Sequence, residues 1–590
     1  MVVGNLIQPY PNTDNLLPDF MSVLYCTQIS LLSQYTISSN SVTITAVRKS
    51  KNRFCLPLLF FIAAYSGAQE FNAVPLDHAA YDIIAMGVIK GIILPPPSAK
   101  PWSLRTVREK LQEMLDDPAQ LEQRGQALSE NEVDIIISTI DSFERRNGFD
   151  LQAARVRLEN DNGTFEAGIG IESNVSLEAP DTSCVKIDAL RLYTGGDIVH
   201  WVSWNLAVLG EKYLFSSNPS DISFDYGVEG ALNFRLADQR LQLRLGRIRR
   251  DWGHGSNGTS LFMNAHAHPF AAFEGTVLPL PWMNISVLTG VLEQNREKKQ
   301  LPEYSDRDNH LQREWSSISS PPDKPISNVL SAARIEFSLL RYFRFDMGAA
   351  ATWLDNPNAA FFSSLELRWH GLFSLWGSIF IDRLDISAQD FTMINSNSYA
   401  YQVGIRANVQ WLPFSSLSLR YSKVEPYCYG AYLDSAFVSD GKSLGYYQPP
   451  NSDELLMRFE SIIIPAIKAY TQFQMIRHGA DYGYGAVGGS SLHDKLSSAN
   501  YIKYFLMDGV YQWDNVIKAG GTFMINAGKV PLVLYAEAGY VMTRFTINGT
   551  AESGNEADYE KLDNSVYRSG DRFIFSAGVR LLLTSFSHIY

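Results

Sequence analysis

Charged side chains are scarce in this sequence, and long uncharged runs are missing as well. Only 19% of the 590 residues are charged, while 46% are hydrophobic and the mean hydropathy is -0.10. A membrane helix needs about 20 nearly uncharged residues in a row, so this spread hydrophobicity excludes a bundle of membrane helices. A surplus of basic residues is also absent, because 50 Lys and Arg stand against 62 Asp and Glu. We therefore expect no nucleic-acid partner.

Cysteine is rare too, with four residues in the chain. Cys26 and Cys55 fall in a region that we expect to be removed. Cys184 and Cys428 lie far apart and show neither a disulfide framework nor the spacing of a metal site. They could form one bridge outside the cytoplasm or remain unpaired, and the sequence leaves both possibilities open.

A recognisable catalytic constellation is also lacking. The glycine- and serine-rich stretch 485–491 has no identifiable base, and the adjacent carboxylates Asp453 and Glu454 would point to opposite faces of a strand. His266 and His268 would share a strand face, but we find no third ligand for a metal ion. We therefore predict that the protein is not an enzyme and that it has no catalytic residue, metal or cofactor.

What the sequence does contain is abundant aromatic side chains, with 32 Phe, 29 Tyr and 11 Trp. So many aromatics exclude a disordered chain. Average hydropathy, many aromatics and little charge together are typical of a transmembrane β-barrel, in which every second residue faces lipid and the others face a wet lumen.

The amino-terminal region predicts a secretory signal. Residues 47–68 combine a basic start, an apolar run of about 12 residues from Phe54 to Tyr65, and the small residues Ser66-Gly67-Ala68. We expect cleavage after Ala68, because the run is too short to span a bilayer as a helix. We interpret residues 1–46 as an upstream extension that is not part of the natural protein.

Residues 69–150 predict a small periplasmic helical module. Tyr81, Ile84, Ala85 and Val88 have helical spacing, which ends at Gly91 and a triple-proline turn. The same spacing returns in Leu104, Val107, Leu111 and Met114. A third helix begins with a capping box from Ser129 to Glu132 and carries Val133, Ile136, Ile137 and Ile140 on one face. The layout weakly resembles the helix hairpin of S-layer-homology modules, although the acidic stretch of that family appears only as Arg105–Glu109 in altered order.

From residue 151 to the end, the period changes from 3.6 to 2, which predicts β-strands. In 401–411, Tyr401, Val403, Ile405, Ala407, Val409 and Trp411 alternate with polar or small residues. The same alternation occurs in 241–246, 334–339, 365–370, 534–542 and 573–581. A soluble sandwich would also alternate, but aromatic strand ends favour the interfacial girdles of a membrane barrel.

Length sets the expected number of strands. If each strand with its connection takes roughly 24 residues, residues 151–590 form about 18 antiparallel strands. Polar insertions at 295–324, 434–453 and 548–571 predict surface loops. The last stretch, from Phe573 with Phe586 and Tyr590 behind it, resembles the closing strand that outer-membrane assembly machinery recognises.

The densest polar cluster lies between Gly246 and Leu261, where the alternation fails and glycine recurs. It predicts a loop folded into the lumen. Guanidinium groups pair with carboxylates and an aromatic plane covers a sugar face, so the cluster suits an acidic sugar. The candidate ligand-binding residues are Arg247, Arg249, Arg250, Asp251, Trp252 and His254. The alternative is that these side chains only fill the lumen with ion pairs.

Further motifs accompany this cluster, namely Arg334-Ile335-Glu336-Phe337, Tyr421-Ser422-Lys423-Val424-Glu425-Pro426, Leu444-Gly445-Tyr446, Pro450-Asn451-Ser452-Asp453-Glu454-Leu455 and Arg477-His478-Gly479. With the cluster, they resemble the Wzi-type capsule-assembly proteins of the bacterial outer membrane over nearly all of the mature length. The usual Gly-Pro-Gly of that family is Gly253-His254-Gly255 here. The resemblance implies an outer-membrane barrel with an obstructed pore, periplasmic helices and a lectin function.

Two functions remain open at this point. The first is a non-enzymatic, lectin-like protein that attaches or organises capsular or other exopolysaccharide at the cell surface. The alternative is a porin or solute channel, because 18 strands can enclose an aqueous channel and luminal arginines would favour anions. In either case we expect a monomer in the bacterial outer membrane, with a glycan, membrane lipid and the assembly machinery as partners.

Overall fold

The structure, a computed structural model, describes residues 72–76, 78–116, 128–143, 148–150, 155–160 and most of the chain from 163 to 581. Within that last part, the longer stretches outside the description are 295–325, 384–397, 481–488, 491–508 and 549–568, together with several short turns. The predicted extension and signal peptide, as well as Phe586 and Tyr590, lie outside the described residues. All described residues belong to one compact unit, Phe60–Tyr590.

Three short helices precede the barrel, as their apolar spacing predicts: α3 (Ala80–Ile89), α4 (Leu104–Glu113) and α6 (Glu130–Phe143). The expected capping box is present, because the backbone N–H of Ser129 donates to Glu132 and that of Glu132 donates to the Ser129 hydroxyl. One prediction is wrong: Ile137 is 43% exposed, and Ile135 is buried instead. None of the helices in the described part of the chain is long and apolar enough to cross a bilayer.

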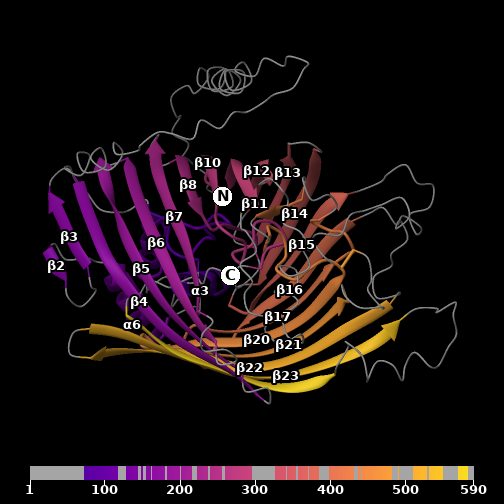
Figure 1. The fold of residues 1–590 in the computed structure, drawn as a ribbon. Coiled ribbons are helices and arrows are strands. Elements are labelled where there is room, and N and C mark those ends of the chain that lie inside the picture. Colours follow the sequence, from indigo (N-terminus) through magenta and orange to yellow (C-terminus); the bar gives the residue numbers. More distant parts are fainter. Residues whose placement is uncertain are drawn as a thin grey trace, which may run out of the picture. The chain divides into compact units, whose positions relative to one another are not determined.

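The strands form a closed antiparallel barrel of 18 strands, which confirms the predicted fold class and strand number (Figure 1). The first nine are β4 (Gly163–Ala179), β5 (Ser183–Val199), β6 (Val202–Phe215), β7 (Ile222–Leu236), β8 (Leu241–Ile248), β10 (Phe270–Leu280), β11 (Met283–Gln294), β12 (Ile326–Leu339) and β13 (Phe343–Thr352). The other nine are β14 (Asn358–Trp369), β15 (Phe373–Arg383), β16 (Ser398–Asn408), β17 (Ser415–Val424), β20 (Ser452–Ile464), β21 (Ile467–Gly479), β22 (Gly509–Ala527), β23 (Val530–Asn548) and β24 (Gly570–Leu581).

The barrel closes between β24 and β4. β24 pairs with β4 over Ile171–Ala179, and the short strand β3 (Arg155–Asn160) pairs with the rest of the same edge over Gly163–Gly168. β3 in turn pairs with β2 (Gly148–Asp150). The predicted closing strand therefore occupies the expected place at the barrel seam.

The two ends of the barrel differ in the length of their connections. Two to six residues join β10 to β11, β12 to β13, β14 to β15, β16 to β17, β20 to β21 and β22 to β23. We call this the short-turn end, and the opposite end, where the long connections lie, the long-loop end. In bacterial outer-membrane barrels, short turns face the periplasm and long loops face the exterior.

The outer and inner faces follow the predicted alternation. Leu365, Leu367 and Trp369 on β14 are 38%, 44% and 65% exposed, whereas the intervening Glu366 and Arg368 are buried. The predicted strand 401–411 is shorter than expected, because β16 ends at Asn408 and the following residues form the turn.

Exposed tryptophans mark the short-turn end of the barrel. Trp201, Trp282, Trp369 and Trp411 are all between 41% and 77% exposed and lie at or next to short turns. This arrangement matches the interfacial girdle expected from the aromatic strand ends.

Two segments fold into the lumen from the long-loop end, and we call their described parts the plug: residues 249–269 and 425–451. Plug side chains including Trp252, Phe262, Phe437 and Leu444 form one apolar core with inward residues of β10 to β17, such as Phe380. The two segments also bond to each other, because Tyr429 donates to the carbonyl of Leu261 at 2.8 Å.

The plug overturns the expectation that residues 434–453 form a surface loop. Phe437 and Leu444 are both 0% exposed, because their apolar side chains pack against the inner wall rather than facing solvent. Asp453 belongs to β20. The sequence did not predict this burial, because polar residues surround the apolar positions.

The helices, with the chain between them, form a module that packs against the short-turn end. Gly371, in the turn between β14 and β15, donates to the carbonyl of Ile89 at 2.9 Å. Phe414, in the turn between β16 and β17, donates to Glu132 at 3.2 Å and belongs to the apolar core of the module. The module and the plug therefore approach each other inside the barrel from opposite ends.

Candidate functional site

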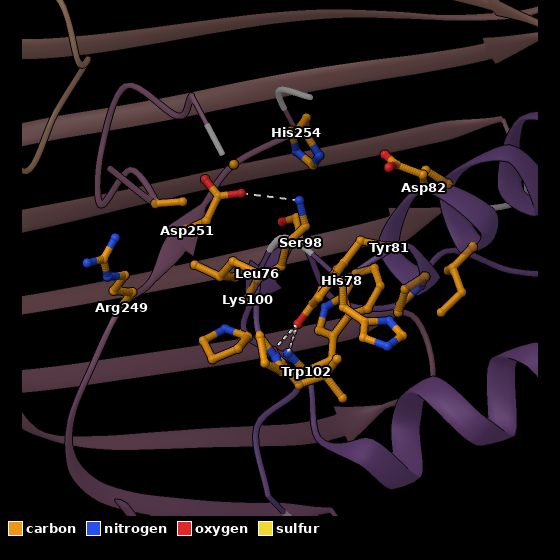
Figure 2. Close-up of a pocket in the computed structure, with 18 of the residues that line it drawn as sticks. Leu76, His78, Tyr81, Asp82, Ser98, Lys100, Trp102, Arg249, Asp251 and His254 are labelled. Carbon is orange, nitrogen blue, oxygen red and sulfur yellow. Dashed lines mark hydrogen bonds and ion pairs between the residues drawn. The ribbon is translucent and has the colours of Figure 1, made fainter. Parts of the chain in front are cut away.

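A cavity of about 550 Å³ lies between the module, the plug and the barrel wall. Figure 2 shows residues of the module and the plug that line it. Its volume falls in the range of roughly 300–1,000 Å³ that is usual for ligand pockets. The charged lining is mainly basic, with Lys100, Arg191, Arg249, Arg344, Arg406, Arg458 and Lys468 against Asp82, Glu229, Asp251 and Glu366. An anionic ligand would therefore be favoured in this cavity.

Arg250, one of the predicted site residues, is buried and holds neighbouring segments of the chain together. It follows the end of β8 and is 2% exposed. Its Nε donates to Glu274 at 3.2 Å, and Nη1 donates to the carbonyls of Ile248 and Phe270 at 3.0 and 3.2 Å. These contacts hold the start of the plug against β10.

Asp251 and Trp252 form the short strand β9, which joins the plug to the module. β9 pairs with β1 (Ala99–Lys100), which lies between α3 and α4, and Lys100 Nζ lies 3.2 Å from Asp251 Oδ2 (Figure 2). The Ser260 hydroxyl also donates to Asp251. Trp252 packs edge-on against Phe262, with ring centroids 6.2 Å apart. Both residues are buried, and of the two only Asp251 lines the cavity.

His254 lies in a buried ionic network with the barrel wall. Its Nε2 is 2.6 Å from Asp346 Oδ2, and its Nδ1 is 3.6 Å from Glu366 Oε2. Arg334 also contacts Asp346, at 2.9 Å, and Arg344 contacts Glu366 at 2.6 Å. The module reaches this network as well, because the backbone N–H of Ser98 donates to Glu336, which lies 3.1 Å from Arg334. The network therefore connects the plug, the module and β12 to β14.

Arg249 is the predicted arginine that is best placed for a ligand. Its side chain is 18% exposed and lines the cavity, with Nε 3.4 Å from Glu229 Oε1. Arg247 lines a neighbouring recess that also contains Arg191 and Arg249. Of the six predicted residues, the cavity thus brings together Arg249, Asp251 and His254, whereas Arg247 lies beside it and Arg250 and Trp252 line neither space.

Asp82 and its partners contribute a part of the cavity that the sequence analysis missed. Asp82, in the first turn of α3, lies 2.6 Å from Lys468 of β21 and 3.5 Å from Arg406 of β16. Burial alone would raise the pKa of Asp82, but Lys468 and Arg406 hold it well below its ordinary value. The alternation of β16 places Arg406 in the lumen, but no local pattern in the sequence pairs it with a helix more than 300 residues away.

The described residues contain no group of three His, Cys, Asp or Glu side chains that could hold a metal ion. His266 is exposed and His268 is buried, so they do not present a common pair of ligands. Cys428 is a free, buried thiol, so the bridge between Cys184 and Cys428 that the sequence left open is not formed.

Comparison with known proteins supports the fold. No known family matches the chain by sequence, and no curated protein matches it either. Among solved structures, it is similar to Wzi of Escherichia coli, an outer-membrane protein involved in group 1 capsule assembly and described as a carbohydrate-binding β-barrel. The TM-score is 0.52 at 13% identity, over 88% of this chain and 100% of Wzi. OprD from Pseudomonas aeruginosa is also similar, with a TM-score of 0.39 and 10% identity over 74% of this chain and 94% of OprD. The chain therefore has the fold of an 18-stranded outer-membrane barrel.

Proposed function

We propose that this protein is an outer-membrane barrel that holds an exopolysaccharide at the cell surface without transporting or cleaving it. The observation that carries the proposal is the obstructed lumen. The plug packs an apolar core against the inner faces of β10 to β17, and the module covers the short-turn end. A diffusion porin needs a continuous aqueous path, which these two bodies restrict.

A glycan is the ligand class that best fits the chemistry of the cavity. Its surplus of Arg and Lys suits carboxylate groups, and Trp102, Trp376 and Tyr81 provide aromatic surface. Wzi, a solved barrel with a similar fold, is described as carbohydrate-binding and involved in capsule assembly. We extend that role to this chain, with capsular or another exopolysaccharide as partner and Arg247 and Arg249 as candidate contacts; the side chain of His254, the other predicted residue at the cavity besides Asp251, is 0% exposed and holds the network in place.

The proposal includes the predicted route to the membrane. A signal peptide at 47–68 directs the chain to the periplasm, the module of residues 69–150 remains on the periplasmic side, and the assembly machinery inserts the barrel as a monomer. The upstream extension 1–46 has no part in this route.

Retention of polymer by cells tests the function. Cells without the protein should release more polysaccharide into the medium than cells with it, and Arg249→Ala should release polymer while the barrel still assembles. Asp188→Asn on the outer face of β5 is a matched control, because that side chain lies away from the cavity. Equal retention in cells with and without the protein would contradict the proposal.

Planar-bilayer conductance separates this function from the alternative of a porin or solute channel. The purified full chain should show no large steady currents, because the plug occupies the lumen beside β10 to β17. Large currents that persist in the unmodified protein would favour a channel for anions.

A further inference from the structure

The apolar core of the plug covers one side of the inner wall, and Tyr446, Tyr447 and Asn451 of the plug also form hydrogen bonds with residues of β20, β21 and β22. The apolar core lies against β10 to β17. On the other side, formed by β20 to β24, β4 and β5, inward charged side chains remain accessible to solvent. Lys518 is 29% exposed, Glu537 30%, Arg580 19% and Arg458 16%. In the part of the chain that the structure describes, this wall holds no residue of the apolar core of the plug; we call it the uncovered wall, and it is a second luminal surface, distinct from the predicted cluster.

Three inward tyrosines on this wall share the same arrangement. Each lies directly across from a glycine of the neighbouring strand: Tyr470 from Gly520, Tyr535 from Gly578, and Tyr193 from Gly168. A Cβ on these glycines would lie 3.0, 2.4 and 2.3 Å from the tyrosine side chain, so each ring covers the backbone of its glycine. Glycine is needed at these positions because any side chain would displace the ring.

Each of the three tyrosine hydroxyls donates a hydrogen bond to a glutamate. Tyr535 donates to Glu172 at 2.6 Å, Tyr193 donates to Glu166 at 3.3 Å, and Tyr470 donates to Glu537. These bonds cross between neighbouring or nearby strands and hold the rings in one orientation. The rings are therefore preorganised surfaces rather than mobile side chains.

An arginine accompanies each tyrosine and glutamate. The Arg458 guanidinium lies 4.0 Å from the centroid of the Tyr470 ring, and Arg580 lies 5.6 Å from that of Tyr535. Arg580 Nε also donates to Glu172 at 2.9 Å, and Arg157 Nη1 is 3.8 Å from Glu166. Each unit thus combines a planar group with a carboxylate and a guanidinium, and of the three carboxylates Glu537 is accessible whereas Glu166 and Glu172 are buried.

The three units lie at a similar depth in the barrel and border the cavity. Tyr470 and Tyr535 are three and five residues after the first residue of their strands, and Tyr193 is six before the last residue of its strand, all counted from the short-turn end. Arg458, stacked on Tyr470, and Arg191, two residues from Tyr193, both line the cavity. The units therefore extend the basic cavity around the uncovered wall.

We propose that this wall is a luminal binding site for an acidic oligosaccharide segment, with Tyr193, Tyr470 and Tyr535 as its stacking surfaces. The inference rests on the proposed retention of exopolysaccharide and places part of the bound polymer inside the barrel. Tyrosine and guanidinium planes contact the apolar faces of sugar rings, and Glu537, whose side chain is 30% exposed, accepts from sugar hydroxyls. The arginines bind carboxylates, since guanidinium forms strong bidentate bonds with them. The surplus of basic side chains in the cavity selects an acidic over a neutral glycan.

Binding of defined oligosaccharides to the refolded full chain tests the site. We use a glucuronate-containing hexasaccharide of hyaluronan type and, as a neutral probe, maltohexaose. The wild-type protein should bind the acidic probe more tightly. Tyr535→Ala and Tyr470→Ala should each weaken that binding by about five- to tenfold, as expected for loss of one aromatic contact. Tyr540→Ala is the matched control, because Tyr540 lies on β23 like Tyr535 but is 40% exposed on the outer face.

Several results would overturn the luminal site. Equal binding by Tyr535→Ala and Tyr540→Ala would exclude the tyrosine wall, and so would absence of binding to either probe by the wild-type protein. Equal affinity for both probes would exclude selection for acidic glycans. The gel-mobility shift between folded and heated barrel shows whether each variant is folded, and Tyr535→Phe, which keeps the ring but loses the bond to Glu172, provides a milder variant.

The same variants in cells distinguish this site from the proposed function. If Tyr535→Ala cells retain polymer while cells without the protein release it, the luminal site fails and the function stands. If cells without the protein retain polymer normally, the function fails whatever the isolated barrel binds.

Discussion

At the scale of single residues, Arg249 and Arg250 are neighbours in sequence with different surroundings. Arg250 is 2% exposed and is paired with Glu274, whereas Arg249 is partly exposed at the cavity. Removing one partner of a buried ion pair leaves the other charge buried and uncompensated, which costs about 3–5 kcal/mol. Glu274 keeps a second partner, Arg244 at 3.6 Å, so Arg250→Ala should lower the free energy of unfolding by up to about that amount.

Arg249→Ala provides the comparison for this prediction. Its pair with Glu229 is partly exposed, so the loss should be about 1 kcal/mol or less. Urea unfolding of both variants in detergent micelles measures the difference. If both substitutions lowered the free energy of unfolding equally, the difference in burial between Arg249 and Arg250 would have no effect on stability.

Cys428 gives a second test of the plug. It is 0% exposed, and burial raises the pKa of its thiol well above the ordinary value. The reactive thiolate is therefore disfavoured and also inaccessible. The wild-type protein and Cys428→Ser should bind the same amount of a thiol reagent at pH 8 when folded and differ by one equivalent after unfolding. A difference in the folded state would mean that the plug opens.

Sequence reasoning found the polar cluster but could not divide it into buried and accessible members. The failure of alternation after Gly246 is a local signal, and it correctly marks the chain that leaves the wall. Burial of Arg250 and Asp251, however, depends on Glu274 and on Lys100, which lies about 150 residues earlier in the chain. No local pattern in the sequence contains such a partnership.

At the scale of elements, hydrophobic periodicity predicts a strand or helix where each of its faces has a single environment along the whole element. Strands such as β8 and β14 have lipid on one face and the lumen on the other, so their alternation reveals them. Residues 434–453 fail this condition, because their apolar side chains pack against a wall that other strands build. In the same way, Ile137 and Ile135 of α6 are both apolar, and packing alone decides which is buried.

The contact between α3 and the barrel has a predictable pH dependence. The pKa of Asp82 is lower in the folded protein than in the unfolded chain, for which about 4 is usual. Its contribution to stability is therefore complete above about pH 4 and is lost as the pH falls toward the folded pKa. Arg406, Arg458 and Lys468 face Asp82 and remain charged throughout this range, and Glu460 pairs with the two arginines.

Acidification should consequently loosen the module before the barrel unfolds. The fluorescence of Trp102, which lies in the module, and the susceptibility of the module to an acid-active protease should change as the pH falls below about 4. Asp82→Asn should show a looser module already at pH 6 and a smaller change on acidification. A wild-type profile identical to that of Asp82→Asn would show that this carboxylate does not hold the helix in place.

At the scale of the whole molecule, one side of the inner barrel wall is covered by an apolar core and the other side is polar and accessible to solvent. The plug and β10 to β17 share an apolar core, while the wall of β20 to β24, β4 and β5 presents charged and aromatic side chains. The module meets the plug through the pairing of β1 with β9. The described part of the lumen therefore keeps a polar surface beside the plug, as the proposed retention of a polymer requires.

Removal of part of the plug should convert the barrel into a channel. Replacing residues 436–447 by a short Gly-Ser linker deletes Phe437, Leu444 and Tyr446 from the core, and an 18-stranded barrel is wide enough to conduct once it is open. The variant should give large, steady currents in planar bilayers, whereas the wild-type protein and Tyr540→Ala stay silent. The currents should favour anions, because basic side chains predominate in the cavity lining. A folded deletion variant without currents would show that the module alone closes the lumen, and selectivity for cations would contradict the electrostatic argument for an acidic ligand.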